Sequence, residues 1–92
     1  MYLIEKKIKI KNNNFLRAHY VAEFVNKSIS YKSNITIAFD KKEVNAKNII
    51  EVMNLRLDID NKIEIKASGE DEKTAVIELK AFVNDETKTT NN

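Results

Sequence analysis

Residues 34–53 read NITIAFDKKEVNAKNIIEVM, and the period of the apolar residues changes within this stretch. Over residues 34–39 large apolar side chains occupy every second position, as they do on one face of a β-strand. Residues 40–42 are of types that form turns, and residues 43–45 can return as a short strand. Residues 48–53 space their apolar side chains three or four apart. The stretch therefore predicts a β-hairpin followed by a short helix.

The same two periods recur on both sides of this stretch. Residues 2–10 alternate isoleucine with lysine and predict a strand, in which Lys6 interrupts the apolar side as at a sheet edge. Residues 16–27 predict a helix and residues 62–67 a further strand. The helix over residues 16–27 has an apolar stripe made of Ala18, Val21, Ala22 and Val25.

A last helix is predicted after Ser68-Gly69-Glu70-Asp71, because acidic residues near its start suit the helix dipole. Its apolar stripe comprises Ala75, Val76, Leu79, Phe82 and Val83. The resulting order is β-α-β-β-α-β-α, with one apolar side to each helix. We therefore predict an α+β fold, an open-faced two-layer sandwich whose four-stranded antiparallel sheet carries three helices on one face.

The length and composition narrow the class of protein. The 92 residues fit one domain, which we place at residues 1–86, followed by a flexible polar tail over residues 87–92. A net charge of +2 is too weak to favour nucleic acid or an anionic membrane as a partner. The absence of cysteine and the single histidine argue against disulfides, a metal site or a bound cofactor.

The chain contains no apolar run near ~18 residues, the length that crossing a membrane requires. Its first eleven residues alternate lysine and isoleucine and contain no apolar block of signal-peptide length. We therefore expect a cytoplasmic protein.

Residues 44–55, VNAKNIIEVMNL, resemble the segment V-N-A-K-S-I-M-G-V-M-S-L of the HPr family. These proteins are the small phosphocarriers of the bacterial phosphoenolpyruvate-dependent sugar phosphotransferase system. Residues 67–72, ASGEDE, also match, and the resemblance runs without a gap to about residue 86. It implies the same open-faced fold and a carrier in a relay rather than an enzyme. The implied partners are enzyme I-like or enzyme II-like proteins, or a regulator of carbon use.

The functional motif of that family, G-[LIF]-H-A-R-P-A, does not match residues 15–21, which read FLRAHYV. Arg17 stands where the family has the histidine that carries the phosphoryl group, and His19 stands where it has the arginine that steadies that group. Tyr20 replaces the proline. Asn48 stands at the regulatory serine, where it can still cap a helix but has no hydroxyl to phosphorylate.

These substitutions leave three interpretations open. A guanidinium is always charged and has no lone pair with which to attack, so Arg17 cannot accept a phosphoryl group. We favour a regulatory or docking module that has lost both phosphorylation sites. The first alternative is an active carrier that accepts the phosphoryl group on His19, with Arg17 as its charge partner. The second is a static site in which Arg17, His19 and free helix amides hold a phosphate anion.

A docking module would contact its partners through residues near the starts of the first two helices. The candidates for partner binding are Phe15, Leu16, Arg17, Tyr20, Ile49 and Met53. Val52, between the last two of these, is expected to belong to the core.

Overall fold

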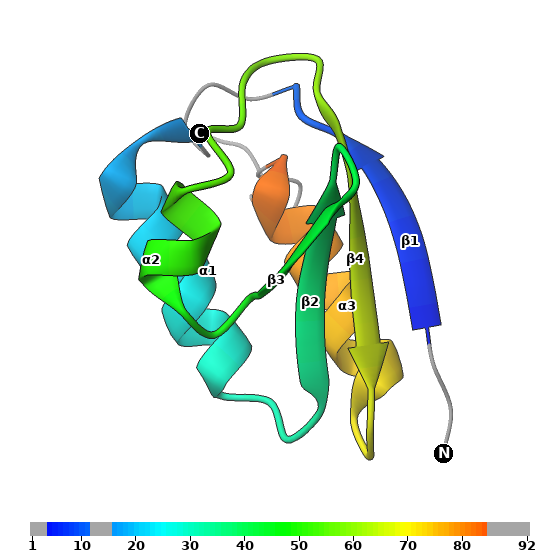
Figure 1. Ribbon diagram of the computed structural model, residues 1–92. Coiled ribbons are helices and arrows are strands. Elements are labelled where there is room, and N and C mark those ends of the chain that lie inside the picture. Colours follow the sequence, from blue (N-terminus) through cyan, green and yellow to red (C-terminus); the bar gives the residue numbers. More distant parts are fainter. Residues whose placement is uncertain (1–3, 12–15, 85–92) are drawn as a thin grey trace, which may run out of the picture.

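The computed structural model has a sheet on one side and helices on the other (Figure 1), and it describes residues 4–11 and 16–84. The strands are β1 (Ile4–Lys9), β2 (Asn34–Phe39), β3 (Lys42–Asn45) and β4 (Lys62–Ser68). The helices are α1 (Ala18–Ile29), α2 (Ile49–Met53) and α3 (Glu72–Val83). The predicted order of elements and the predicted open-faced α+β sandwich are confirmed.

The four strands form one sheet in the order β1-β4-β2-β3, and all neighbours are antiparallel. Ile37 lies in the middle, opposite Ile65 on one side and Val44 on the other. The β2–β3 hairpin turns at Asp40 and Lys41, whose φ angles are 51° and 68°. Two consecutive positive φ angles match the right-handed twist of a two-residue hairpin. The sheet therefore ends in two edges, β1 and β3.

The buried side of α1 differs from the predicted stripe. Val21, Phe24, Val25 and Ser28 are buried, whereas Ala18 is exposed. Two overlapping stripes with helical spacing share Val21 and Val25, and the predicted stripe is the one with two alanines. The stripe that includes Phe24 is the one buried, because an aromatic ring removes far more apolar surface from water than an alanine does.

The predicted stripe of α3 is confirmed. Ala75, Val76, Leu79 and Val83 are fully buried, and Phe82 is partly buried. Within residues 4–11 and 16–84, no helix has both the length and the apolar character needed to cross a membrane. The predicted domain end at residue 86 and the predicted tail over residues 87–92 lie outside the described residues.

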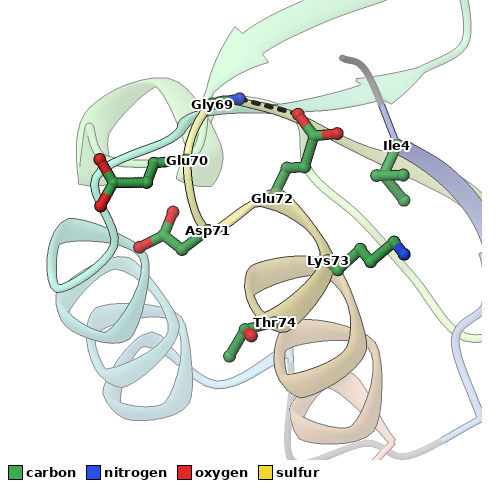
Figure 2. Close-up of a pocket in the computed structure, with 7 residues that line it drawn as sticks. All are labelled: Ile4, Gly69, Glu70, Asp71, Glu72, Lys73 and Thr74. Atoms are coloured by element: carbon green, nitrogen blue, oxygen red, sulfur yellow. Dashed lines mark hydrogen bonds between the residues drawn. The ribbon is translucent and has the colours of Figure 1, made fainter. Parts of the chain in front are cut away.

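The turn that leads into α3 packs closely against the turn that leads into β2. Gly69 has a φ of +151°, and a Cβ at this position would lie 2.7 Å from the Cα of Ser33. The carboxylate of Asp71 accepts hydrogen bonds from the backbone of Lys32 (2.8 Å) and from the backbone and hydroxyl of Ser33 (2.9 and 2.6 Å). Glu72 reaches back to accept the Gly69 N–H at 2.9 Å (Figure 2). These contacts join two turns that are far apart in sequence.

Gly69→Ala is expected to lower the free energy of unfolding by about 1–3 kcal/mol, because the new methyl group meets the backbone of Ser33 and the φ angle disfavours any side chain. Urea unfolding followed by circular dichroism measures the change. Lys73→Ala on the exposed side of α3 is the control and should leave stability nearly unchanged. An unchanged midpoint for Gly69→Ala would contradict the close approach.

Asp71 is expected to make the stability of the fold depend on pH. The hydrogen bond from the Ser33 hydroxyl, helped by the backbone N–H groups of Lys32 and Ser33, lowers the pKa of Asp71 to about 2. A lowered folded-state pKa means that this stabilisation is complete above the unfolded pKa, about 4. It is then lost as the pH falls towards 2.

The melting temperature of the wild type should therefore fall more steeply between pH 4 and pH 2 than that of Asp71→Asn. Glu70→Gln is a matched control, because it removes a neighbouring carboxylate that contacts only the exposed ammonium of Lys32 among the described residues. Equal slopes for the wild type and Asp71→Asn would show that the hydrogen bonds to Asp71 do not stabilise the fold.

Candidate functional site

The candidate site is built at the start of α1. Arg17 is the N-cap of this helix, with extended backbone angles (φ −82°, ψ 141°), and its carbonyl accepts the first helical hydrogen bond from Val21 at 3.0 Å. Its side chain makes no capping hydrogen bond, and the first turn contains no acidic residue. The first amide N–H groups of a helix have no acceptors within the helix. The site therefore combines a helix N-terminus with an exposed guanidinium.

His19 lies on the outer side of α1. Its Nε2 atom is 2.9 Å from the Oε2 atom of Glu23, one turn further along the helix, and its side chain is 77% exposed. Its ring also meets the edge of Tyr20, with 5.8 Å between the centroids. His19 and Glu23 belong to the solvent-facing stripe that is opposite to Phe24 and Val25. The imidazole is thus engaged along the helix, away from its N-terminus.

Leu16 is next to Arg17 in the chain and lies on a different side of the site from His19. It lines a small groove between α1 and α2. The groove has a volume of about 90 Å³ and is lined by Leu16, Val21, Val52, Met53, Arg56 and Leu57. All the lining residues except Arg56 are apolar, and Arg56 contributes a cation. Neither Arg17 nor Arg56 forms an ion pair within the described part of the chain. The groove therefore has apolar walls and unneutralised positive charge beside it.

Asn48 performs the capping role that the sequence predicts. Its side chain accepts a hydrogen bond from the backbone N–H of Glu51 at 3.1 Å, and α2 begins at Ile49. The Glu51 side chain in turn accepts from the backbone N–H of Asn45 at 3.0 Å. The start of α2 is thus held by an amide side chain in place of a hydroxyl.

The predicted partner-binding residues occupy different surroundings. Leu16 and Met53 line the groove, and Ile49 is partly buried against the core, to which Val52 belongs as expected. The ring of Tyr20 packs edge-on against Phe82 of α3, with 6.0 Å between the centroids, so much of it is turned towards α3. Phe15 lies outside the described residues.

Two residues at this surface were not among the predicted site residues. Ile50 is 65% exposed on α2, where it shares a side with Met53, which is 45% exposed. Arg56 follows α2 and has a φ of 54°, in the left-handed region that non-glycine residues rarely adopt. The VNAKNIIEVMNL segment shows that Ile50 is apolar, but a helix of five residues has too few turns to reveal which side is exposed. We call Leu16, Arg17, Ile50, Met53 and Arg56 the α1–α2 face.

Two further features lie apart from this face. A hollow of about 470 Å³ at the start of α3 is lined by Ile4 and residues 69–74 (Figure 2), but the acidic side chains there already bond to nearby N–H groups. Among residues 4–11 and 16–84, no group of three or more histidine or acidic side chains is arranged to hold a metal ion. Neither feature adds chemistry to the candidate site.

Comparison with known proteins gives the family. The model of the family described as "PTS HPr component phosphorylation site" matches residues 4–85. HPr-like protein Crh of Bacillus subtilis is 31% identical over 84 residues, which cover 91% of this chain and 99% of the relative. Phosphocarrier protein HPr of Buchnera aphidicola subsp. Schizaphis graminum is 39% identical over 77 residues, which cover 84% and 91%. The structure of HPr from Bacillus anthracis superposes with a TM-score of 0.85 at 30% identity, covering 89% and 98%.

The fold is that of a small open-faced α+β protein with the architecture of the HPr phosphocarriers. The chain belongs to the HPr family. Members of this family are carriers in the phosphotransferase system and interact with its enzymes, rather than being enzymes in their own right.

Arg56→Gly is expected to raise the free energy of unfolding by about 1 kcal/mol, because glycine adopts the left-handed conformation without the steric cost that an arginine Cβ imposes. Chemical unfolding at neutral pH measures the gain. Asp60→Gly, at a φ of 68°, is the control and should give a smaller gain, because aspartate tolerates this region better. A loss of stability in Arg56→Gly would mean that contacts of the arginine side chain outweigh the backbone strain.

Proposed function

We propose that this protein is a divergent HPr-like docking or regulatory module of the sugar phosphotransferase system, acting in the cytoplasm without the usual phosphohistidine or regulatory phosphoserine. The observation that carries the proposal is that the two sides of the start of α1 have different surroundings. Leu16 beside Arg17 lines the groove to α2, while His19 pairs with Glu23 on the solvent side. The imidazole and the groove that a partner would enter therefore lie on different sides of the helix.

The chemistry of the two altered positions supports loss of phosphoryl transfer. Arg17 stands where the family motif has its nucleophile, and a permanently protonated guanidinium cannot attack phosphorus. Asn48 keeps the start of α2 capped but offers no hydroxyl to a kinase. Phosphoryl transfer also requires in-line alignment of donor and acceptor. Arg17 is the extended N-cap whereas His19 lies inside α1 and pairs with Glu23, so His19 does not simply replace the lost acceptor.

The α1–α2 face supplies a surface for docking. Its apolar residues are Leu16, Ile50 and Met53, Arg56 lines the groove, and the exposed Arg17 adjoins Leu16 in the chain. Buried apolar anchors surrounded by charged groups are typical of protein interfaces. Such a surface suits an enzyme I-like or enzyme II-like protein, or a regulator, that presents acidic groups around an apolar patch. The relative Crh is described as a catabolite repression HPr, which supports a regulatory role.

Phosphoryl transfer on His19 remains the second candidate, favoured by the exposure of the ring. Its side chain is 77% exposed, and its pair with Glu23 is a surface contact worth only about 0.3–0.5 kcal/mol. A donor could therefore displace Glu23 at little cost.

A static phosphate site formed by Arg17, His19 and the helix amides is the third candidate, and amide NMR shifts of residues 17–20 during a phosphate titration test it directly.

Incubation with phosphoenolpyruvate and enzyme I of a working phosphotransferase system separates the first two functions. We expect intact-mass measurement to show no phosphoryl adduct on this protein, since Arg17 occupies the acceptor position. A known HPr in the same reaction is the positive control. The double variant Arg17→His with His19→Arg should gain an adduct, which shows that the fold itself remains competent for transfer.

The docking arm of the same experiment measures binding to enzyme I by titration calorimetry. Ile50→Ser should weaken binding about tenfold, as expected for an apolar anchor, whereas Ile77→Ser on α3, equally exposed at 65%, should not. An acid-labile adduct on the wild type that disappears in His19→Ala would replace the docking proposal with the carrier function.

A further inference from the structure

Along the outer edge of β1, most backbone N–H and C=O groups have no partner among residues 4–11 and 16–84, and they follow a defined pattern. Ile10, directly after β1, forms hydrogen bonds with the segment that precedes β4. Its N–H donates to the Asn61 carbonyl at 2.9 Å, and its C=O accepts from the Asp60 N–H at 2.8 Å. In an antiparallel pair such residues alternate with residues whose N–H and C=O both point away. Glu5, Lys7 and Lys9 therefore direct their backbone groups outward. Among the described residues no strand pairs with this edge (Figure 1).

One end of the edge is already closed by a side chain. The amide group of Asn84 donates to the Lys9 carbonyl at 2.9 Å and accepts from the Lys11 N–H at 2.8 Å. It thus occupies the two positions that a residue of a further strand would fill. The open part of the ladder runs from Glu5 to the Lys9 N–H, and an added strand would be confined to this length.

An apolar groove runs beside the open part of this edge. It has a volume of about 390 Å³ and is lined by Ile4, Glu5, Lys6, Lys73, Val76 and Ile77. Ile77 is 65% exposed although it is a large aliphatic side chain. Figure 2 shows the side chain of Lys73 extending from α3 towards the side on which β1 lies. The groove therefore offers an apolar surface on the helix side of the free edge.

The charge on β1 indicates what kind of strand fits. Its six residues include three lysines and one glutamate. Lys6, Lys7 and Lys73 form no ion pair within the described part of the chain. Two copies of β1 would bring together two strands that each carry three lysines against one glutamate, and the antiparallel register centred on Lys7 would place Lys7 opposite Lys7. This net like charge disfavours self-association through this edge. An acidic strand would instead find unneutralised cations on both faces.

We propose that the outer edge of β1 is a docking site for an extended acidic segment of another protein, which adds to the sheet as a fifth strand. Its backbone bonds to Glu5, Lys7 and the Lys9 N–H, as in other cases of strand addition. Alternate apolar side chains pack against Ile4 and Ile77 in the groove. The acidic side chains between them face Lys7 on the open side of the sheet. This surface is separate from the α1–α2 face.

The probe is a blocked seven-residue peptide that alternates glutamate with valine, added to the full-length ¹⁵N-labelled protein. We expect saturable shifts of the Glu5, Lys7 and Lys9 amide signals, and slower hydrogen exchange of these amides in the complex. A peptide with lysine in place of glutamate should bind at least about fivefold more weakly, because it repeats the charge of β1.

Two pairs of variants test the groove and the charge separately. Ile77→Ser should weaken binding of the acidic peptide by about fivefold or more, whereas Ile50→Ser, at an equally exposed isoleucine on α2, should not. Lys7→Glu should weaken it similarly, whereas Lys42→Glu on the other edge strand, β3, should not. The amide spectrum of each variant checks that the variant is folded.

Three results would overturn the proposal. The first is the absence of amide shifts at β1 with millimolar peptide. The second is slow exchange of the Glu5 and Lys7 amides before any peptide is added, which would mean that the chain itself already covers the edge. The third is concentration-dependent self-association that Ile77→Ser abolishes, which would make a second copy the occupant.

Discussion

The burial of Phe24 fixes the rotation of α1, and the geometry of the candidate site depends on that rotation. Phe24 is fully buried, and the centroid of its ring lies 6.2 Å from the centroid of the Phe82 ring on α3. With 3.6 residues per turn, this anchor turns Val21 and Val25 inward and leaves His19 and Glu23 in solvent. The separation of His19 from the groove is therefore a consequence of core packing.

Most of the fold could be predicted from the sequence because it follows from local periods. Alternation gives the strands, helical spacing gives α3, and the residues at Asp40 and Lys41 give the hairpin. Contacts between distant segments could not be predicted. The hydrogen bonds of Asp71 to residues 32–33 and of Asn84 to residues 9–11 join positions that no local pattern connects. The choice between Ala18 and Phe24 likewise depends on what the helix packs against.

The candidate site was predictable where a residue type decides the chemistry. The guanidinium of Arg17 and the missing hydroxyl at Asn48 can be identified from single positions in the motif, and the N-cap at Asn48 follows from its residue type. Ile50 and Arg56 required coordinates. The exposure of Ile50 depends on how a five-residue helix packs on the core. The positive φ of Arg56 is a conformation that arginine rarely adopts.

The fold tolerates change at this site because the altered residues contribute little to its stability. A cation at an exposed helix N-terminus costs only about 0.3–1 kcal/mol, while domains are typically stable by about 5–15 kcal/mol. Asn48 replaces a hydroxyl cap with an amide cap, and the hydrogen bond to Glu51 is kept. The core residues that hold α1 and α2, among them Val21, Phe24 and Val52, are separate from both positions. Substitution at positions 17 and 48 is therefore compatible with the fold, because the packing of α1 and α2 does not depend on these two side chains.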